Sequence, residues 1–379
     1  MPNALGDFFS KLFSKNDGQS VLGLDIGSSA IKAVQIKKKK GKAVLETYGE
    51  LSLGPYAGVE VGRATRIDNA TLIQAINDLF SIKEVNITTR ITGMAIPMRA
   101  SMVSVLTFPT SDEKKLAEMV PLEARKYIPV PISEVAFDWS VIPNAFSGED
   151  ANEKDSAKNK QAPFKTEVLV VAIHNDTLSA YAELTTKTGL QNTFYEIEMF
   201  GAMRALLDQS QIAPALVIDF GSATTKIYIV EAGIVRESHV INRGFQDITL
   251  NISTSLSVPI DLAEQLKRNY GSNKAEDDKH VGDVATLVLD ALFSEINTVM
   301  VSYQRKHAKN IGLVYLTGGG ASMKGMAEKS LQHLSIKTEI GNSFSKVQVP
   351  AFLQEVLKAT GTGFSVAVGV ALRKLQELG

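Results

Sequence analysis

The chain of 379 residues is 44% hydrophobic, which is enough to bury a large core in two domains or in one domain built of two halves. Its 40 basic residues are balanced by 41 acidic residues, so it lacks the overall positive charge that favours nucleic-acid binding. Cysteine is absent, which excludes disulfides, thiol nucleophiles and Cys-ligated zinc and fits a reducing compartment such as the cytoplasm.

Residues 1–19 read as an N-terminal arm without the long apolar core of a signal peptide. No apolar run approaches the roughly 18 residues that a membrane span requires. If the arm is helical, four apolar side chains share one face with two lysines beside them: Phe8, Phe9, Leu12, Phe13, Lys11 and Lys15. Such a stripe suits either a weak contact with anionic lipid or an arm that packs on its own domain or stays mobile.

The first predicted element after the arm is a β-hairpin. Residues 21–26 and 31–36 read as apolar strands, and Gly27 lies in the turn between them. The pattern LDIGSSAIK of residues 24–32 returns 194 residues later as IDFGSATTK, so both halves of the chain open with the same hairpin. Because neither glycine opens a helix, the P-loop and Rossmann fingerprints are excluded. The repeat in register indicates a duplicated unit.

These hairpins have a chemistry suited to phosphate. Glycine lets the turn backbone approach a ligand, while exposed N–H groups and hydroxyls can cradle phosphate oxygens. The aspartates that precede the turns, Asp25 and Asp219, are suited to a hydrated magnesium ion. Two such hairpins facing each other would clamp a triphosphate.

A third glycine stretch, Gly318 to Gly320, follows an apolar strand later in the chain. Three glycines let the backbone lie flat against a base or ribose, and Ser322 is expected to cap the next helix. Residues 283–305 show a helical period of apolar residues and predict a helix packed on the core. Residues 147–161 are charged and polar without a period and predict a mobile loop.

In this order, the three motifs resemble the phosphate 1, phosphate 2 and adenosine motifs of the actin-like ATPase superfamily. Residues 263–267 are similar to the AExxK helix of its bacterial division and cell-shape members, and residues 198–202 and 366–371 are similar to its small-residue helices that cross between domains. The resemblance implies an α/β fold, the ribonuclease H-like two-domain actin fold with duplicated mixed β-sheet cores, and ATP with Mg²⁺ between the domains. The residues it assigns to the nucleotide are Asp25, Gly27, Ser28, Ser29, Lys32, Asp219, Gly221, Ser222, Thr224, Thr225, Lys226, Glu264, Lys267, Gly318, Gly319, Gly320 and Ser322.

The resemblance also assigns roles in chemistry. It implies that Glu198 orients an attacking water and that Asp25 and Asp219 hold the magnesium ion through water. Met199 stands where many relatives have proline after this glutamate, so at most slow ATP hydrolysis is expected.

Within the superfamily, residues 123–135 (EARKYIPVPISEV) resemble the EAxxYIPFPLEEV segment of the PilM family of type IV pilus assembly. This implies a first domain over residues 20–205 and 361–379, an FtsA-like inserted subdomain over about 91–163, and a second domain over residues 206–360.

The family resemblance implies a cytoplasmic adaptor held at the inner-membrane face of a pilus machine or a related type II secretion-like machine. Its implied partner is the cytoplasmic tail of a PilN-like membrane protein, with pilus motor ATPases and the platform protein as further partners. Tyr127, Ile128 and Pro129 lie in the segment expected near the partner groove. Two alternatives are a filament-forming protein of the FtsA type and a small-metabolite kinase.

Overall fold

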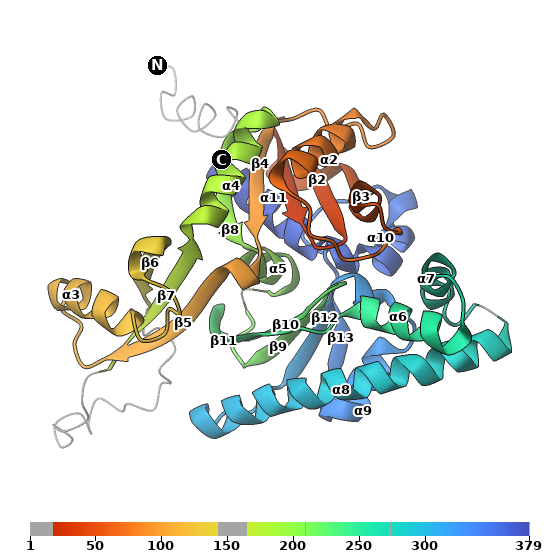
Figure 1. Ribbon diagram of the computed structural model, residues 1–379. Coiled ribbons are helices and arrows are strands. Elements are labelled where there is room, and N and C mark those ends of the chain that lie inside the picture. Colours follow the sequence, from red (N-terminus) through yellow and green to blue (C-terminus); the bar gives the residue numbers. More distant parts are fainter. Residues whose placement is uncertain (1–17, 143–164, 209, 273, 379) are drawn as a thin grey trace, which may run out of the picture.

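The computed structural model describes residues 18–142, 165–208, 210–272 and 274–378. The interpretations made for the N-terminal arm and for the loop at residues 147–161 lie outside these residues. Figure 1 shows two α/β domains beside each other and a smaller lobe that projects from the first of them.

Each domain is built on a mixed five-stranded sheet. The first sheet has the order β3-β2-β1-β4-β8 and the second has the order β11-β10-β9-β12-β13. The strands of the first are β1 (Ser20–Ile26), β2 (Ala30–Lys39), β3 (Lys42–Ser52), β4 (Ile91–Ile96) and β8 (Gln191–Ile197). Those of the second are β9 (Ala215–Phe220), β10 (Thr225–Glu231), β11 (Ile234–Ile241), β12 (Leu313–Thr317) and β13 (Thr338–Ile340). The two sheets therefore have the same topology, which confirms the duplication predicted from the repeated motif.

The two opening hairpins also share their register. In the antiparallel pair β1–β2, Asp25 lies opposite Lys32, and in β9–β10 Asp219 lies opposite Lys226. Each turn closes in the same way, because the glycine N–H donates to the carbonyl three residues later, at 2.9 Å in the first hairpin and 3.0 Å in the second. Each hairpin thus presents one aspartate and one lysine at the same place beside a glycine turn.

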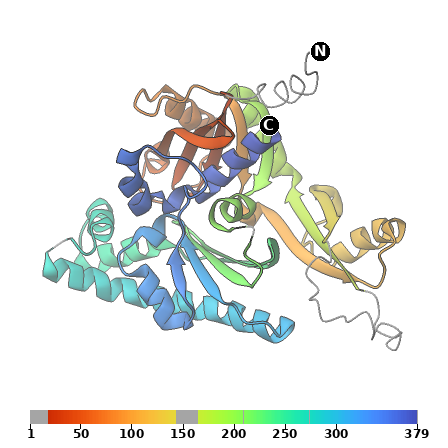
Figure 2. The ribbon, with the colours of Figure 1, turned by 180° about the vertical axis from the view of Figure 1, so that it is seen from behind.

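Helices cover both sheets. On the first sheet, α2 (Asn69–Ser81) and α4 (Asn175–Lys187) pack together over one face and bury Ile76, Leu79 and Leu184 in its core. On the second, the long helix α8 (Ala275–His307) packs with α6 (Phe245–Leu256), α7 (Ile260–Arg268) and α9 (Met326–Leu334). Figure 2 shows the sheets and their helices from behind. The helix predicted over residues 283–305 is confirmed and lies within α8.

The domains meet at two helices of small residues, α5 (Glu198–Leu206) and α11 (Ser365–Glu377), which are the two crossing segments identified in the sequence. Helix α11 returns to the first domain and packs against β1 and β2, where Ala367, Val368 and Ala371 join the core with Val21 and Val34. The short helix α10 (Gln354–Thr360) precedes it.

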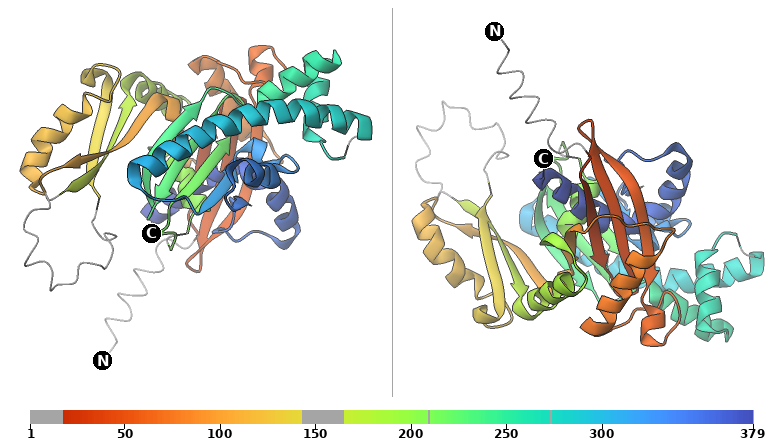
Figure 3. Two further views of the ribbon diagram at one scale, coloured as in Figure 1. Left: turned by 90° about the horizontal axis from the view of Figure 1, so that it is seen from below. Right: turned by 90° about the horizontal axis from the view of Figure 1, so that it is seen from above.

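The projecting lobe is a three-stranded antiparallel sheet of order β5-β7-β6, covered by α3 (Glu113–Ala124). Its strands are β5 (Ser101–Phe108), β6 (Val135–Val141) and β7 (Thr166–His174). The expected insertion bounds of about 91 and 163 need correction. The strand β4 belongs to the first main sheet, and β7 (Thr166–His174), which lies beyond residue 163, is the central strand of the inserted sheet. Figure 3 shows this inserted sheet projecting to one side of the molecule.

The inserted sheet is braced against the second domain. Strand β5 lies along β11, and Arg236 of β11 donates to the carboxylate of Glu167 in β7 at 2.5 Å. Arg236 also pairs with Glu231 at 3.2 Å, so its guanidinium is held from both sides. The lobe therefore contacts both domains.

Two helical stretches, Ala275–His307 and Ala351–Glu377, are long and apolar enough by length and composition to cross a membrane. In the structure the first buries a stripe of side chains in the core of the second domain, and the second supplies the buried helix α11. The buried apolar residues of both stretches thus belong to the core of the fold.

Candidate functional site

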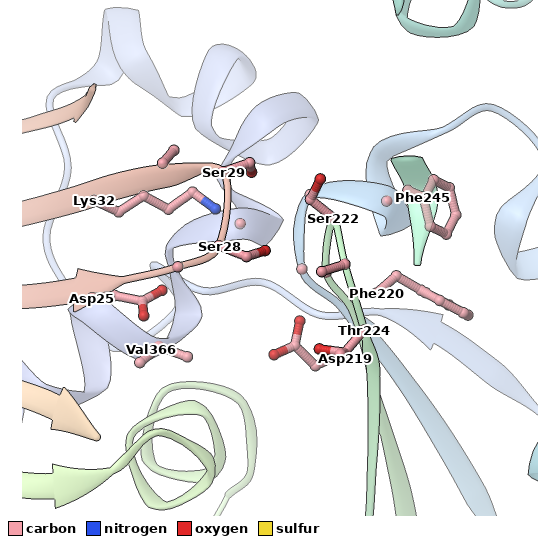
Figure 4. A pocket seen from close by; sticks show the side chains of 18 of the residues that line it. Asp25, Ser28, Ser29, Lys32, Asp219, Phe220, Ser222, Thr224, Phe245 and Val366 are labelled. Carbon is pink, nitrogen blue, oxygen red and sulfur yellow. The ribbon is translucent and has the colours of Figure 1, made fainter. Parts of the chain in front are cut away.

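A cavity of about 550 Å³ lies between the two domains. It is lined by the turns of both hairpins, by the glycine stretch after β12, by α7 and by the start of α11. Figure 4 shows the two turns facing each other across this space, with the carboxylates of Asp25 and Asp219 directed toward it. The cavity contains every residue that the sequence assigned to a nucleotide except Thr225.

Thr225 is a correction to the predicted set. Its side chain is fully buried and its hydroxyl donates to the carbonyl of Arg243 at 3.0 Å. Neighbouring residues of a strand point to opposite faces of the sheet, so the strand that directs Lys226 into the cavity turns Thr225 away from it.

Lys226 joins the carboxylates of the cavity. Its Nζ lies 2.5 Å from Oε2 of Glu198 and 3.3 Å from Oδ2 of Asp219. Burial alone would lower the pKa of Lys226, but the charges of Asp219, Glu198 and Asp25 outweigh it and hold the pKa well above 10.5. The ammonium is therefore charged at every physiological pH.

Asp25 completes this group from the other hairpin. Burial raises its pKa from 3.8 to about 6, with Lys32 and Lys226 opposing the shift and Glu198 and Asp219 adding to it. The charged form of Asp25 is thus costly to hold in the folded chain.

Glu198 opens helix α5 and both of its carboxylate oxygens are engaged. Oε2 accepts from Lys226, and Oε1 accepts from the backbone N–H of Met98 at 2.7 Å. Met98 lies in the single turn η2 (Met98–Ala100) that joins β4 to β5. The side chain that the resemblance assigned to water positioning is here a buried tie between the second domain and the root of the inserted sheet.

The other lysine, Lys32, has a different surrounding. Its Nζ lies 4.0 Å from Glu50 and 6.0 Å from the ring centroid of Phe364. A Cβ at Gly363 would lie 3.0 Å from this ammonium, so the glycine leaves room for the lysine at the cavity wall. Among the described residues, Lys32 has only this weak ion pair with Glu50. Its ammonium group is therefore suited to binding an anionic ligand.

Glu264 and Lys267 form the opposite wall on α7. Lys267 Nζ lies 2.6 Å from Glu264 and donates to the hydroxyl of Thr249 at 2.8 Å, while Arg268 donates to the other oxygen of Glu264 at 2.7 Å. Burial would raise the pKa of Glu264, but the ion pair with Lys267 and the bonds from Thr249 and Arg268 hold it below its usual value. This network fixes a polar surface suited to hydroxyl groups of a ligand.

The glycine stretch is packed against the rest of the site. Gly318 has a φ of 82°, and a Cβ there would lie 2.3 Å from Oδ1 of Asp219. A Cβ at Gly320 would lie 2.4 Å from the ring of Phe245. Only glycine allows β12 to end this close to both neighbours.

Ser322 lines the cavity, as expected. It does not cap the next helix, although the sequence predicted that it would. It ends the short turn η4 (Gly319–Ser322), and its hydroxyl donates back to the carbonyl of Gly319 at 2.8 Å. Helix α9 begins only at Met326, after Gly325 in a left-handed conformation with a φ of 82°. The prediction was wrong because the extra turn separates the serine from the helix.

Sequence reasoning missed a segment of the first domain, residues 60–65, that crosses to the second. Ser222 of the second hairpin donates to the carbonyl of Gly62 at 3.0 Å, and Gln246 of α6 accepts from the N–H of Ala64 at 3.2 Å. The same segment reaches the first hairpin, since Thr65 N–H donates to the carbonyl of Ser28 at 2.8 Å. Gly62 in this segment has a φ of 90°. We identified no sequence motif that predicts the crossing.

The residues expected near a partner groove have different exposures. Tyr127 is 52% exposed and Pro129 is exposed, whereas Ile128 is only 7% exposed and packs in the core beneath α3. Ile128 is therefore a structural residue of the inserted sheet, and its assignment to the groove needs correction.

Three comparisons with known proteins agree with this geometry. The chain is 25% identical over 362 residues to the cell division protein FtsA of Neisseria meningitidis, covering 87% of this chain and 86% of that protein. A solved structure described as a PilM-PilN type IV pilus biogenesis complex matches with a TM-score of 0.75 and 24% identity, covering 94% of this chain and 98% of that one. MreB5 of Spiroplasma citri bound to AMPPNP matches with a TM-score of 0.51 and 12% identity over 96% of this chain and 98% of that chain.

These likenesses confirm the actin-like ATPase fold, with two mixed five-stranded sheets and an extra antiparallel sheet. The profile of the family described as type IV pilus assembly protein PilM matches residues 23–375, which spans both domains and the inserted sheet. The chain therefore belongs to the PilM family of type IV pilus assembly proteins.

Proposed function

We propose that the cavity binds ATP and that the chain uses this nucleotide while acting as an adaptor of a pilus assembly platform. The observation that carries the proposal is the pair of hairpins in one register, each with a glycine turn and a lysine, facing each other across the cavity. Backbone N–H groups and ammonium groups at such turns favour phosphate oxygens. The solved MreB5 with AMPPNP, which shares the fold, supports the nucleotide class.

The wall formed by α7 suits the sugar and base of this nucleotide. The glycine stretch has no side chains, so its backbone can lie flat against the base or ribose. Glu264 and Lys267 have fixed polar atoms at the cavity, and Gly318 to Gly320 line it without side chains. The phosphates would then lie toward the hairpin turns.

A magnesium ion bound with the nucleotide would be held, through water, by Asp25 and Asp219, the residues first assigned to it. A hydrated magnesium ion needs carboxylate oxygens free to face it in octahedral geometry. Both oxygens of Glu198 are engaged by Lys226 and Met98, whereas the carboxylate of Asp25 and Oδ1 of Asp219 line the cavity without a hydrogen bond or ion pair among the described residues. Such an ion would supply positive charge to the phosphate oxygens. With Glu198 held in this way, at most slow hydrolysis is expected.

The output we propose is binding of the cytoplasmic tail of a PilN-like membrane protein at the inserted sheet, which would hold the chain at the inner-membrane face. The likeness to a PilM-PilN complex supports this partner. An extended peptide gains affinity from main-chain hydrogen bonds and a few side-chain pockets. The exposed Tyr127 lies on this lobe beside α3.

A fluorescence titration tests the adaptor. The N-terminal cytoplasmic peptide of the neighbouring PilN-like protein is titrated into the full chain with ATP present, and a scrambled peptide serves as control. Saturable binding by the native peptide alone is expected. Equal binding of both peptides, or none at high micromolar concentration, would contradict the adaptor role, and sedimentation in ATP would then test for filaments.

A further inference from the structure

Three neighbouring strands of the first sheet end at the cavity. Strands β1, β4 and β8 run parallel, with Leu24 opposite Met94 and Ile96 opposite Ile197, so their carboxyl ends lie at one edge of the sheet. Ligands of open α/β sheets bind outside this edge. The residues that follow the three strands all line the cavity: the first glycine turn after β1, the turn η2 after β4, and Glu198 after β8. The turn after β4 therefore belongs to the wall that faces the ligand.

The duplicated fold gives this turn a counterpart in the second domain. By sheet order β4 corresponds to β12, and β12 is followed by the glycine stretch and the short turn η4. The residues after β4 are Pro97, Met98 and Arg99, so the first domain has an arginine where the second has bare glycine backbone. A nucleotide whose adenosine lies on the glycine stretch would extend its phosphates past both glycine turns, toward the turn that carries Arg99.

Arg99 differs from other cations that line the cavity. Lys226, Lys267 and Arg268 each lie within 2.7 Å of a glutamate carboxylate oxygen. Arg99 is exposed and lines the cavity, and no residue in the described part of the chain forms an ion pair or a hydrogen bond with its guanidinium. A guanidinium has five N–H donors in a planar fork that matches two oxygens of a phosphate. These donors are therefore available to an anionic ligand.

A terminal phosphate needs positive charge at this end of the cavity. The carboxylates of Asp25, Asp219 and Glu198 line it and would repel a phosphate, and Lys226 is already paired with two of them. We propose that Arg99 binds the terminal phosphate of ATP, so that the site distinguishes ATP from ADP. This inference rests on the proposed nucleotide function and adds to it the residue that recognises the third phosphate.

A displacement titration tests the contact. A fluorescent ADP analogue is bound to the full chain in Mg²⁺ and displaced by ATP or by ADP, which gives a Kd for each nucleotide. Arg99→Met should lower the ratio of the ADP Kd to the ATP Kd by at least about fivefold, through weaker binding of ATP. A smaller fall in the ratio would overturn the inference while leaving nucleotide binding intact. Failure of the wild-type chain to bind the analogue, ATP or ADP would overturn the proposed function and this inference with it.

Two variants control for charge and for surface effects. Lys32→Met removes another cation of the cavity and should weaken both nucleotides, with a change in the ratio of less than about twofold. Arg66→Met removes an exposed arginine that does not line the cavity and should change neither Kd. A fivefold fall in the ratio for Lys32→Met as well would attribute the preference to total charge and overturn the contact. If Arg99→Met fails to fold, Arg99→Gln decides by the same fivefold criterion.

Discussion

Gly369 of α11 packs directly on the backbone of α5, so closely that a Cβ at this position would lie 1.7 Å from the carbonyl oxygen of Gly201. This contact sets the distance between the two helices at the junction of the domains. Gly369→Ala must push the helices apart, and we expect it to lower the free energy of unfolding by about 3 kcal/mol.

Urea unfolding measures this loss. Gly312→Ala is a suitable control, because a Cβ there has no neighbour within 4 Å. Equal stability of the two variants would show that the helices accommodate the methyl group without cost.

The raised pKa of Asp25 predicts a pH dependence of stability. The carboxyl titrates near 3.8 when unfolded and near 6 when folded, so between these values the folded chain holds a proton that the unfolded chain has lost. Stability therefore falls as the pH rises through this window, by about 3 kcal/mol in total.

Asp25→Asn should remove this loss. The variant should exceed the wild type in stability at pH 7.5, and the advantage should shrink as the pH falls toward 4. Urea unfolding of both chains across this range provides the measurement, and an advantage that is the same at every pH would rule out Asp25 as its source.

Loss of a hydrogen bond to the crossing segment, residues 60–65, should destabilise that segment locally. Ser222→Ala removes the hydrogen bond to the carbonyl of Gly62. Such a bond contributes about 1 kcal/mol, so amide hydrogen exchange in the segment should become about fivefold faster. Ser322→Ala is the control, since its hydroxyl bonds only within its own turn among the described residues. Unchanged exchange in both variants would mean that other contacts hold the segment.

The neighbours Tyr127 and Ile128 predict two different phenotypes. Tyr127→Ala should weaken binding of the PilN-like peptide, raising its Kd by about tenfold. It should leave the free energy of unfolding unchanged, because the ring of Tyr127 is exposed. Ile128→Ala should instead cost about 2–5 kcal/mol of stability by leaving a cavity in the inserted sheet. Peptide titration and urea unfolding separate the effects, with the exposed Lys126→Ala as control. Loss of peptide binding in the stable Lys126→Ala variant alone would move the contact to the charged residue.

The hairpins were predictable because everything that defines them is local. Alternating apolar residues, a glycine turn and a repeated spacing were enough to identify β1–β2 and β9–β10 and to expect Asp25 and Asp219 in one cavity. The crossing helices were identified instead from the resemblance of residues 198–202 and 366–371 to the small-residue helices of the superfamily.

What the sequence could not predict depends on contacts between distant segments. The bonds of residues 60–65 join parts of the chain that are 160 and 182 residues apart, and no local pattern encodes them. The burial of Ile128 follows from how α3 lies on the inserted sheet. The ion pair of Lys226 with Glu198 likewise needs two domains to be placed before it can be recognised.

That single carboxylate has a mechanical consequence. Glu198 links two parts of the structure. One of its oxygens accepts a hydrogen bond from Lys226 at the cavity, and the other accepts from the N–H of Met98, in the turn that precedes the inserted sheet. A ligand that draws Lys226 toward itself would weaken the bond between Lys226 and Glu198, while the bond between Glu198 and Met98 remains. A displacement of Lys226 would therefore change the contacts of the side chain that also holds the turn before the inserted sheet.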